Sequence, residues 1–217
     1  MQTIGILVAD DHAVVRRGLR ALLETQPNWK VLGEASNGRE AVEKAAALNP
    51  QVVILDIGMP KLNGLDAATL IFKANPKARI LMLTMHAADA LIQQTLQAGA
   101  SGYVLKSDAE RDLITAVDAL LHNKMFFTAA ASSLVLEHLR VGYSRRELAA
   151  EKERLSVRER EVVQLLAEGK SNKEIGASLH ISKRTVDHHR ARIMDKLHVQ
   201  SVGELVLYAV RNKIVEP

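Results

Sequence analysis

Residues 52–64 read VVILDIGMPKLNG, an unbroken apolar run that ends on one acid and passes into a turn containing proline and glycine. A run without polar alternation is typical of a parallel strand that is covered on both faces. The acid, Asp56, then stands at the carboxyl end of that strand, where open α/β sheets bind their ligands. The stretch predicts a central strand with a functional residue at its tip.

Similar segments occur on both sides of this central run. The other short, β-branched apolar runs are Ile4–Val8, Val31–Gly33, Ile80–Leu83 and Tyr103–Leu105. Between the runs, apolar residues recur at the spacing of one helix face. Five strands that alternate with helices predict an α/β fold over residues 1–124, with a doubly wound, five-stranded parallel sheet.

Four more polar residues stand at the ends of the predicted strands. Asp10 and Asp11 follow the first strand, Thr84 ends the fourth, and Lys106 follows the fifth. Because the carboxyl ends of parallel strands share one edge of the sheet, we expect these side chains to converge on Asp56. Taken singly, each has an ordinary explanation, such as a helix cap, a turn residue or a surface charge. Together they predict one site.

The three carboxylates of this site would repel one another and raise one another's pKa. A hard divalent cation relieves that repulsion, and Mg²⁺ suits a few carboxylates, a backbone carbonyl and water. We therefore expect Asp10, Asp11 and Asp56 to bind Mg²⁺, with the backbone carbonyl of Gly58 as a further ligand.

A carboxylate beside a metal and a lysine can accept a phosphoryl group. We expect Asp56 to be the nucleophile, while Lys106 pairs with the phosphoryl oxygens and the Thr84 hydroxyl donates a hydrogen bond to one of them. The chain has no GxxxxGK[ST] loop, so an ATPase is not supported. Asp56 is interpreted as a regulated acceptor, and the protein as no turnover enzyme.

Four motifs in this part of the chain resemble the receiver domains of NarL/FixJ-type response regulators. They are DDH at 10–12, LDIGMPKLNG at 55–64, LTMH at 83–86 and GASGYVLK at 99–106. The resemblance implies a flavodoxin-like receiver in which a partner histidine kinase phosphorylates Asp56. It also implies that Thr84 and Tyr103 form a switch pair, in which Thr84 moves towards the phosphate and Tyr103 turns into the vacated space.

The C-terminal part has a different pattern. We expect a partly helical linker over residues 125–152, with a helix near Ser133–Arg140, and then a smaller all-α domain over residues 153–217. The four helices predicted in this domain are Val157–Glu168, Lys173–Leu179, Lys183–Leu197 and Val202–Arg211. Two helices joined by a short turn, the second with a polar outer face, fit either a helix-turn-helix or a plain helical bundle.

The amino-acid sequence of residues 155–199 favours the helix-turn-helix over the plain bundle. This segment resembles the LuxR-type helix-turn-helix and reads LSVREREVVQLLAEGKSNKEIGASLHISKRTVDHHRARIMDKLHV. The resemblance implies that the helix from Lys183 reads double-stranded DNA and that the protein binds as a homodimer. The expected DNA contacts are Lys183, Arg184, Asp187, His188 and Arg192.

The charge is unevenly distributed along the chain. Residues 1–128 carry 13 basic and 13 acidic side chains, whereas residues 129–217 carry 16 and 12, so the whole net charge of +4 lies in the C-terminal part. A basic excess fits a polyanionic partner, although charge alone fits a solvated helix face better. The absence of cysteine, of an N-terminal signal pattern and of a membrane-spanning apolar run leads us to expect a soluble, cytoplasmic protein.

These features predict a two-component response regulator, in which phosphorylation of Asp56 controls sequence-specific DNA binding and transcription. The expected partners are DNA, a sensor histidine kinase, a second copy of the chain when phosphorylated or DNA-bound, and RNA polymerase as a candidate, with no membrane. Two alternatives remain open at this point. The C-terminal helices could form a protein-interaction module, or Asp56 could have lost its phosphorylation.

Overall fold

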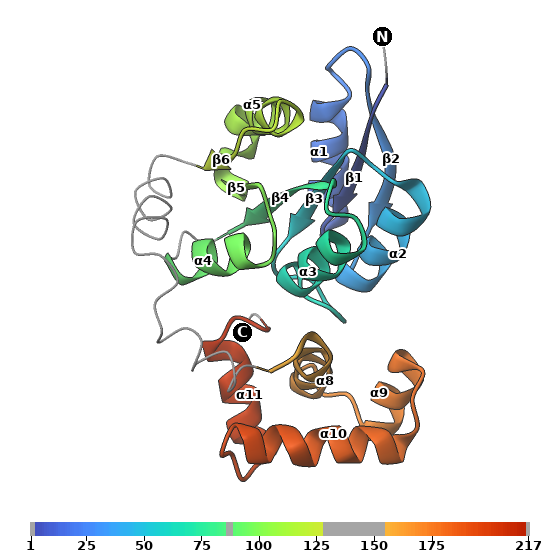
Figure 1. Ribbon diagram of the computed structural model, residues 1–217, viewed down its shortest axis with the longest axis vertical. Helices are drawn as coiled ribbons and strands as arrows, with labels where there is room; N and C mark the ends of the chain where they lie inside the picture. The colour runs from blue at the N-terminus through green and yellow to red at the C-terminus, as the bar shows by residue number, and fades with distance from the viewer. Residues whose placement is uncertain (1–2, 86–88, 128–154, 216–217) are drawn as a thin grey trace. The chain divides into compact units, whose positions relative to one another are not determined.

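A computed structural model describes residues 3–85, 89–127 and 155–215 of the chain (Figure 1). The described residues form two compact units, one before and one after residues 128–154 in the sequence. Most of the expected linker, including the helix predicted near residues 133–140, lies outside the described residues.

The first unit is built on a parallel sheet whose strand order is β2-β1-β3-β4-β5-β6. The strands are β1 (Ile4–Ala9), β2 (Trp29–Ala35), β3 (Val52–Asp56), β4 (Arg79–Thr84), β5 (Gly102–Leu105) and β6 (Phe126–Phe127). The first five contain the five predicted runs, which confirms the doubly wound α/β fold. The central strand β3 is buried along its whole length, as its unbroken apolar pattern indicates.

The sixth strand was not predicted. Phe126 and Phe127 pair in parallel with Gly102 and Tyr103 of β5, although the sequence pattern placed both phenylalanines at the start of the linker. The two rings lie against opposite faces of the sheet, each beside a different core cluster. Aromatic residues favour extended backbone, and here the edge of β5 supplies the partner that a two-residue strand needs.

Helices cover both faces of the sheet (Figure 1). One face packs against α2 (Gly38–Leu48), α3 (Gly64–Ala74) and α4 (Asp89–Gln97), and the other against α1 (Ala13–Leu23) and α5 (Ala109–Leu121). A short 3₁₀ turn, η1 (Lys106–Asp108), leads from β5 into α5. Two apolar clusters therefore sandwich the sheet and leave its carboxyl edge as the place where polar side chains gather.

The second unit consists, in its described part, of four helices close to those predicted. They are α8 (Val157–Ala167), α9 (Asn172–Leu179), α10 (Lys183–Lys196) and α11 (Val202–Arg211). Each begins after a serine whose side chain accepts a hydrogen bond from the backbone N–H three residues later. Such caps satisfy donors that a helix start leaves unpaired, which is why the boundaries are readable in the sequence.

Buried side chains from all four helices form one apolar core, in which Val162, Ile175, Val186, Ile193 and Leu205 are at most 1% exposed. No helix in the described ranges combines the length and the apolarity that crossing a bilayer requires.

Candidate functional site: an acidic pocket and an exposed helix face

The carboxyl edge of the sheet brings the predicted site residues together. Asp56 is the last residue of β3 and Thr84 the last of β4, while Asp10 follows β1 and Lys106 follows β5. Asp10, Asp56 and Thr84 are buried, at 0%, 4% and 2% exposure. Their positions follow from the parallel order of the strands, as predicted.

Lys106 bridges two of the carboxylates. Its Nζ lies 2.8 Å from Oδ2 of Asp10 and 2.8 Å from Oδ2 of Asp56. Burial alone would lower the pKa of Lys106, but the hydrogen bonds that it donates to the two aspartates, and their attraction, outweigh burial, so its pKa lies above its ordinary value. The site therefore contains a permanent positive charge beside Asp56 at neutral pH.

The Asp56 carboxyl group has an unusual pKa. Burial raises it from 3.8 to about 6; Lys106 acts to lower it, and repulsion from Asp10 and Asp11 adds to the rise. Asp56 is thus ionised at neutral pH and poorly solvated. A carboxylate in this state is a suitable nucleophile for a phosphoryl donor.

The pocket fits a hard cation. Ligand atoms of Asp10, Asp11, His12 and Asp56 all lie within 4.8 Å of one another. Three of these residues offer carboxylate oxygens, which Mg²⁺ prefers, and Asp11 is exposed and therefore accessible to metal-bound water. Gly58, the expected carbonyl ligand, lies half-buried in the turn two residues after Asp56.

Two side chains next to this pocket were not predicted. Nδ1 of His12 lies 2.7 Å from Oδ1 of Asp11, and Arg16 donates a 2.7 Å hydrogen bond from Nη1 to the backbone carbonyl of Asp10. Arg16 also contacts Glu34 of β2, at 3.4 Å. The DDH string was a signal for His12, whereas the link from Arg16 to a backbone carbonyl has no sequence signature.

The turn after β3 holds Asp56 in place. Gly64 donates a backbone hydrogen bond of 2.9 Å to the carbonyl of Ile57, and a Cβ at Gly64 would lie 2.0 Å from the backbone oxygen of Asp56. Asn63 caps α3 by accepting a hydrogen bond from the N–H of Asp66. Only glycine permits so close an approach of the start of α3 to the end of β3.

Thr84 and Tyr103, the expected switch pair, lie on neighbouring strands. Tyr103 pairs with Met82 in the sheet, and Thr84 lies two residues further along β4, so both side chains point to the same face. Tyr103 is 1% exposed and belongs to the core cluster on the α3–α4 side. Its ring is therefore already turned inward in this structure.

In the second unit, α9 and α10 are joined by a three-residue connection in which Ser182 caps α10. Ile181 donates a 2.9 Å backbone hydrogen bond to Gly176, and a Cβ at Gly176 would lie 2.7 Å from the carbonyl of Ile181. This close approach sets the crossing of the two helices. Val186 and Ile193 on the inner side of α10 are fully buried.

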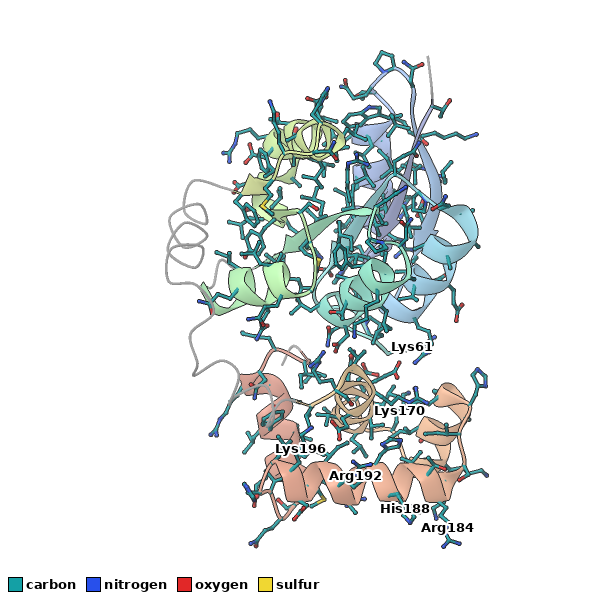
Figure 2. The ribbon with its side chains drawn as sticks, viewed as in Figure 1. Lys61, Lys170, Arg184, His188, Arg192 and Lys196 are labelled. Carbon is teal, nitrogen blue, oxygen red and sulfur yellow. The ribbon has the colours of Figure 1, made fainter. Side chains whose placement is uncertain are left out.

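The outer face of α10 carries the side chains that the sequence pattern singled out. Lys183, Arg184, Asp187, His188 and Arg192 are all exposed. Figure 2 shows Arg184 and His188 on the side of α10 turned away from α8. Within the described parts of the chain, none of Lys183, Arg184 and Arg192 forms an ion pair, so their charges are available to a polyanion.

An ion pair links α8 to α10, and a hydrogen bond links α8 to the end of α9. Nζ of Lys196 lies 3.1 Å from Oε2 of Glu159 in α8. Arg158 contacts Glu161 at 2.6 Å and donates a 2.9 Å hydrogen bond to the last carbonyl of α9, that of Leu179. These contacts make α8 a support that fixes the positions of both α9 and α10.

The last helix, α11, has two different sides. Leu205 and Ala209 are buried in the core, whereas Leu207 is 55% exposed. Val202 and Val206, which the sequence pattern placed in the same stripe as Leu205, are partly exposed. Packing within the unit thus accounts for only part of that stripe.

Two family models match the chain. The response regulator receiver domain matches residues 6–118, which include the acidic pocket. The luxR family of bacterial regulatory proteins matches residues 153–209, which include α8, α9, α10 and most of α11.

Response regulators from three bacteria are similar to this chain, two of them over nearly its whole length and one over 64% of it. Response regulator protein VraR of Staphylococcus aureus is 35% identical over 214 residues, 99% of this chain and 100% of that protein. A solved two-component response regulator of the LuxR family from an Aurantimonas species is 34% identical, with a TM-score of 0.60 over 64% of this chain and 99% of that chain. RcsB of Salmonella enterica serovar Typhimurium is 29% identical, with a TM-score of 0.58 over 99% of this chain and 100% of that chain. That structure was solved bound to a promoter in the presence of the phosphomimetic BeF₃⁻.

Proposed function

Because this chain belongs to the LuxR family of two-component response regulators, we propose that a sensor histidine kinase phosphorylates Asp56 and thereby controls binding of α10 to promoter DNA. The main support is the buried Asp56 carboxylate, 2.8 Å from Lys106 and beside Asp10 and Asp11. The receiver, residues 1–124, is the acceptor, and residues 153–217 bind DNA.

The chemistry follows from the side chains of the pocket. An oxygen of Asp56 attacks the phosphorus of a phosphohistidine donor; a P–O bond forms, the P–N bond breaks, and the imidazole leaves with its electron pair. Lys106 pairs with the phosphoryl oxygens, and the Thr84 hydroxyl donates to one of them. Positioning and neutralisation of charge are most of what this transfer requires from a protein.

Asp10, Asp11 and Asp56 would hold Mg²⁺, with the backbone carbonyl of Gly58 as a further ligand. When bound, the ion neutralises charge on the carboxylates and on the incoming phosphoryl oxygens. The oxygen-rich set of donors within 4.8 Å supports this assignment.

Phosphorylation changes the face of the sheet that carries the switch pair. Thr84 moves towards the phosphoryl group and vacates space for the ring of Tyr103, which is 1% exposed in this structure. A ligand of this kind acts by shifting the population between two conformations. Since the phosphoryl group is retained until hydrolysis, Asp56 serves as an acceptor and the protein is no turnover enzyme.

On DNA, the N-terminal half of α10 reads base edges while the flanking cations contact phosphates. The proposed contacts are Lys183, Arg184, Asp187, His188 and Arg192, all of which are exposed. We further propose a homodimer on DNA, paired in part through the exposed side of α11 around Leu207. A transcription regulator of this type acts in the cytoplasm, where RNA polymerase is a further candidate partner.

The first test measures the intact mass of the protein after incubation with acetyl phosphate and Mg²⁺. We expect one phosphoryl adduct that depends on Mg²⁺ and is absent from the Asp56→Asn variant. A folded wild-type protein that acquires no adduct would contradict the proposed acceptor role and favour phosphate-independent DNA binding.

The second test distinguishes a DNA reader from a protein-interaction module. Arg184→Glu and Arg192→Glu should each abolish or strongly weaken DNA binding, whereas Lys73→Glu on the exposed side of α3 should not. The slope of log K against log salt is negative, and replacement of either arginine by alanine should reduce its magnitude by about 0.9 for each DNA phosphate that the arginine neutralises. A slope and affinity unchanged in every variant would favour the interaction module.

A further inference from the structure

Asp187 is an exposed acid on α10, among the exposed side chains of Arg184, His188 and Arg192. It is the fifth residue of α10, in the half of a recognition helix that approaches base edges, and it lies between Arg184 and His188 in the sequence. Near DNA phosphates a carboxylate is repelled, so its presence on this face requires a donor that compensates. The role inferred for Asp187 rests on the proposed DNA-binding function of this face.

A second side chain fixes the position of this acid. Nδ2 of Asn172, the first residue of α9, donates a 2.5 Å hydrogen bond to Oδ1 of Asp187. Asn172 is half-buried, and it directly follows Ser171, which caps the start of α9 through hydrogen bonds with Glu174. The carboxylate of Asp187 is thus oriented by a neighbouring helix rather than left to rotate freely.

The partner of Asp187 is neutral, and this matters for its charge. Asn172 is an amide, and within the described ranges of the chain no cation lies within ion-pair distance of Asp187. No counter-ion of the described chain therefore offsets the charge of this carboxylate. One oxygen accepts from Asn172, and the charge of the group strengthens any further hydrogen bond that it accepts.

The edges of the four bases differ in what they offer such a group. In the major groove cytosine presents an amino donor at N4, whereas guanine presents two acceptors and thymine one acceptor and a methyl group. Adenine has an amino donor, but its N7 acceptor lies beside it and repels a carboxylate. We propose that Asp187, positioned by Asn172, is a specificity-determining residue that selects cytosine at one position of each half-site.

The test is a selection of binding sites from a random duplex pool by the full-length protein, with and without acetyl phosphate and Mg²⁺. Wild type should prefer cytosine at one position of the half-site. Asp187→Ala should reduce that preference by about 5- to 150-fold while raising affinity for unrelated DNA, because a repulsive charge is lost. Asp187→Asn should shift the preference towards adenine, whose N6 and N7 suit an amide.

Asp195→Ala is the matched control. It removes the same charge from an exposed position two turns further along α10. This variant should bind unrelated DNA more tightly and should keep the cytosine preference of wild type.

Asn172→Ala tests the positioning role. It should weaken the cytosine preference without raising affinity for unrelated DNA, because the carboxylate remains but is no longer oriented. If Asn172→Ala and Asp187→Ala lower thermal stability and leave base preference unchanged, the pair is only a structural link between α9 and α10, and the inference is wrong.

The failure of the inference is distinguishable from failure of the proposed function. A wild-type protein that selects no sequence in either condition contradicts DNA reading itself. A wild-type protein that selects a clear sequence whose base preferences are the same in Asp187→Ala contradicts only the role of Asp187.

Discussion

The ammonium group of Lys106 lies 2.8 Å from a carboxylate oxygen of Asp56. The same nitrogen lies 2.8 Å from Asp10, so one lysine joins carboxylates from the ends of two neighbouring strands, β1 and β3. Because all three groups are at least 90% shielded from solvent, their charges act on one another strongly. The behaviour of Asp56 therefore depends on Lys106.

Replacement of Lys106 by methionine keeps a long side chain but removes its charge. We expect phosphorylation of Asp56 by acetyl phosphate to slow about tenfold or more at pH 7, because the pKa of Asp56 rises further and the pairing with phosphoryl oxygens is lost. The initial rate of adduct formation, followed by intact mass, checks this. Lys124→Met, at an exposed position, should have the wild-type rate, and an equal rate in both variants would exclude the role given to Lys106.

The pKa of Asp56 predicts how stability depends on pH. Burial raises this pKa from 3.8 to about 6, so the folded chain holds the proton more tightly than the unfolded chain does. The free energy of unfolding should therefore fall as pH rises from about 4 through about 6. The Asp56→Asn variant has no such fall in stability. We expect its free energy of unfolding to exceed that of wild type by about 1–3 kcal/mol at pH 7.5, with a smaller difference near pH 4.

Urea unfolding in EDTA measures this effect, followed by the fluorescence of Trp29, the single tryptophan of the chain, which lies in β2 of the first unit. Added Mg²⁺ should stabilise wild type and have little effect on Asp56→Asn, since ligand binding to the folded state raises its stability. A difference between the two proteins that is constant over this pH range would contradict the pKa assignment.

Two glycines should respond in opposite ways to the same substitution. Gly64→Ala places a Cβ 2.0 Å from the backbone oxygen of Asp56, and we expect a destabilisation of about 1–3 kcal/mol together with slower phosphorylation. Gly18→Ala adds a methyl group to an exposed position of α1 with no atom within 4 Å, and should stabilise by up to about 1 kcal/mol. Urea unfolding by Trp29 fluorescence compares them, and equal effects would show that the turn after β3 can move.

The Glu159–Lys196 pair predicts acid sensitivity in the second unit. Burial alone would raise the pKa of Glu159, but hydrogen bonds from Ser156 and Lys196 outweigh it, so its pKa lies below its ordinary value of 4.5. The stabilisation from Glu159 is therefore present above about pH 4.5 and is lost as pH falls through the lowered pKa.

Hydrogen exchange of peptides from α8 measures this effect in the full chain. Protection of the wild-type helix should decrease as pH falls below 4.5, after correction for the intrinsic exchange rate. Glu159→Gln should show weaker protection at neutral pH and a smaller pH dependence. Parallel profiles for the two proteins would mean that the ion pair contributes nothing measurable.

The sequence pattern predicted most of the fold because the apolar runs and helix caps that it contains are the ones that the packed structure uses. Unbroken apolar runs such as Val52–Leu55 become buried strands, and the serines before α8, α9, α10 and α11 become caps. The site at the carboxyl edge followed from the same reasoning, since parallel strands must bring their ends to one side. A two-residue strand such as β6 has no periodicity to detect, and only the free edge of β5 explains it.

The sequence by itself determined the α/β class, the order of the helices, the residue set of the acidic pocket and the outward face of α10. Each of these depends on residue type, on spacing along a segment or, for the pocket, on the parallel order of the strands. Only the tertiary structure decided that Lys106 bridges Asp10 and Asp56, that Arg16 holds the Asp10 carbonyl, and that Asn172 orients Asp187. These contacts join residues from different elements, and their distances are set by how the elements pack, which residue spacing along the chain does not encode.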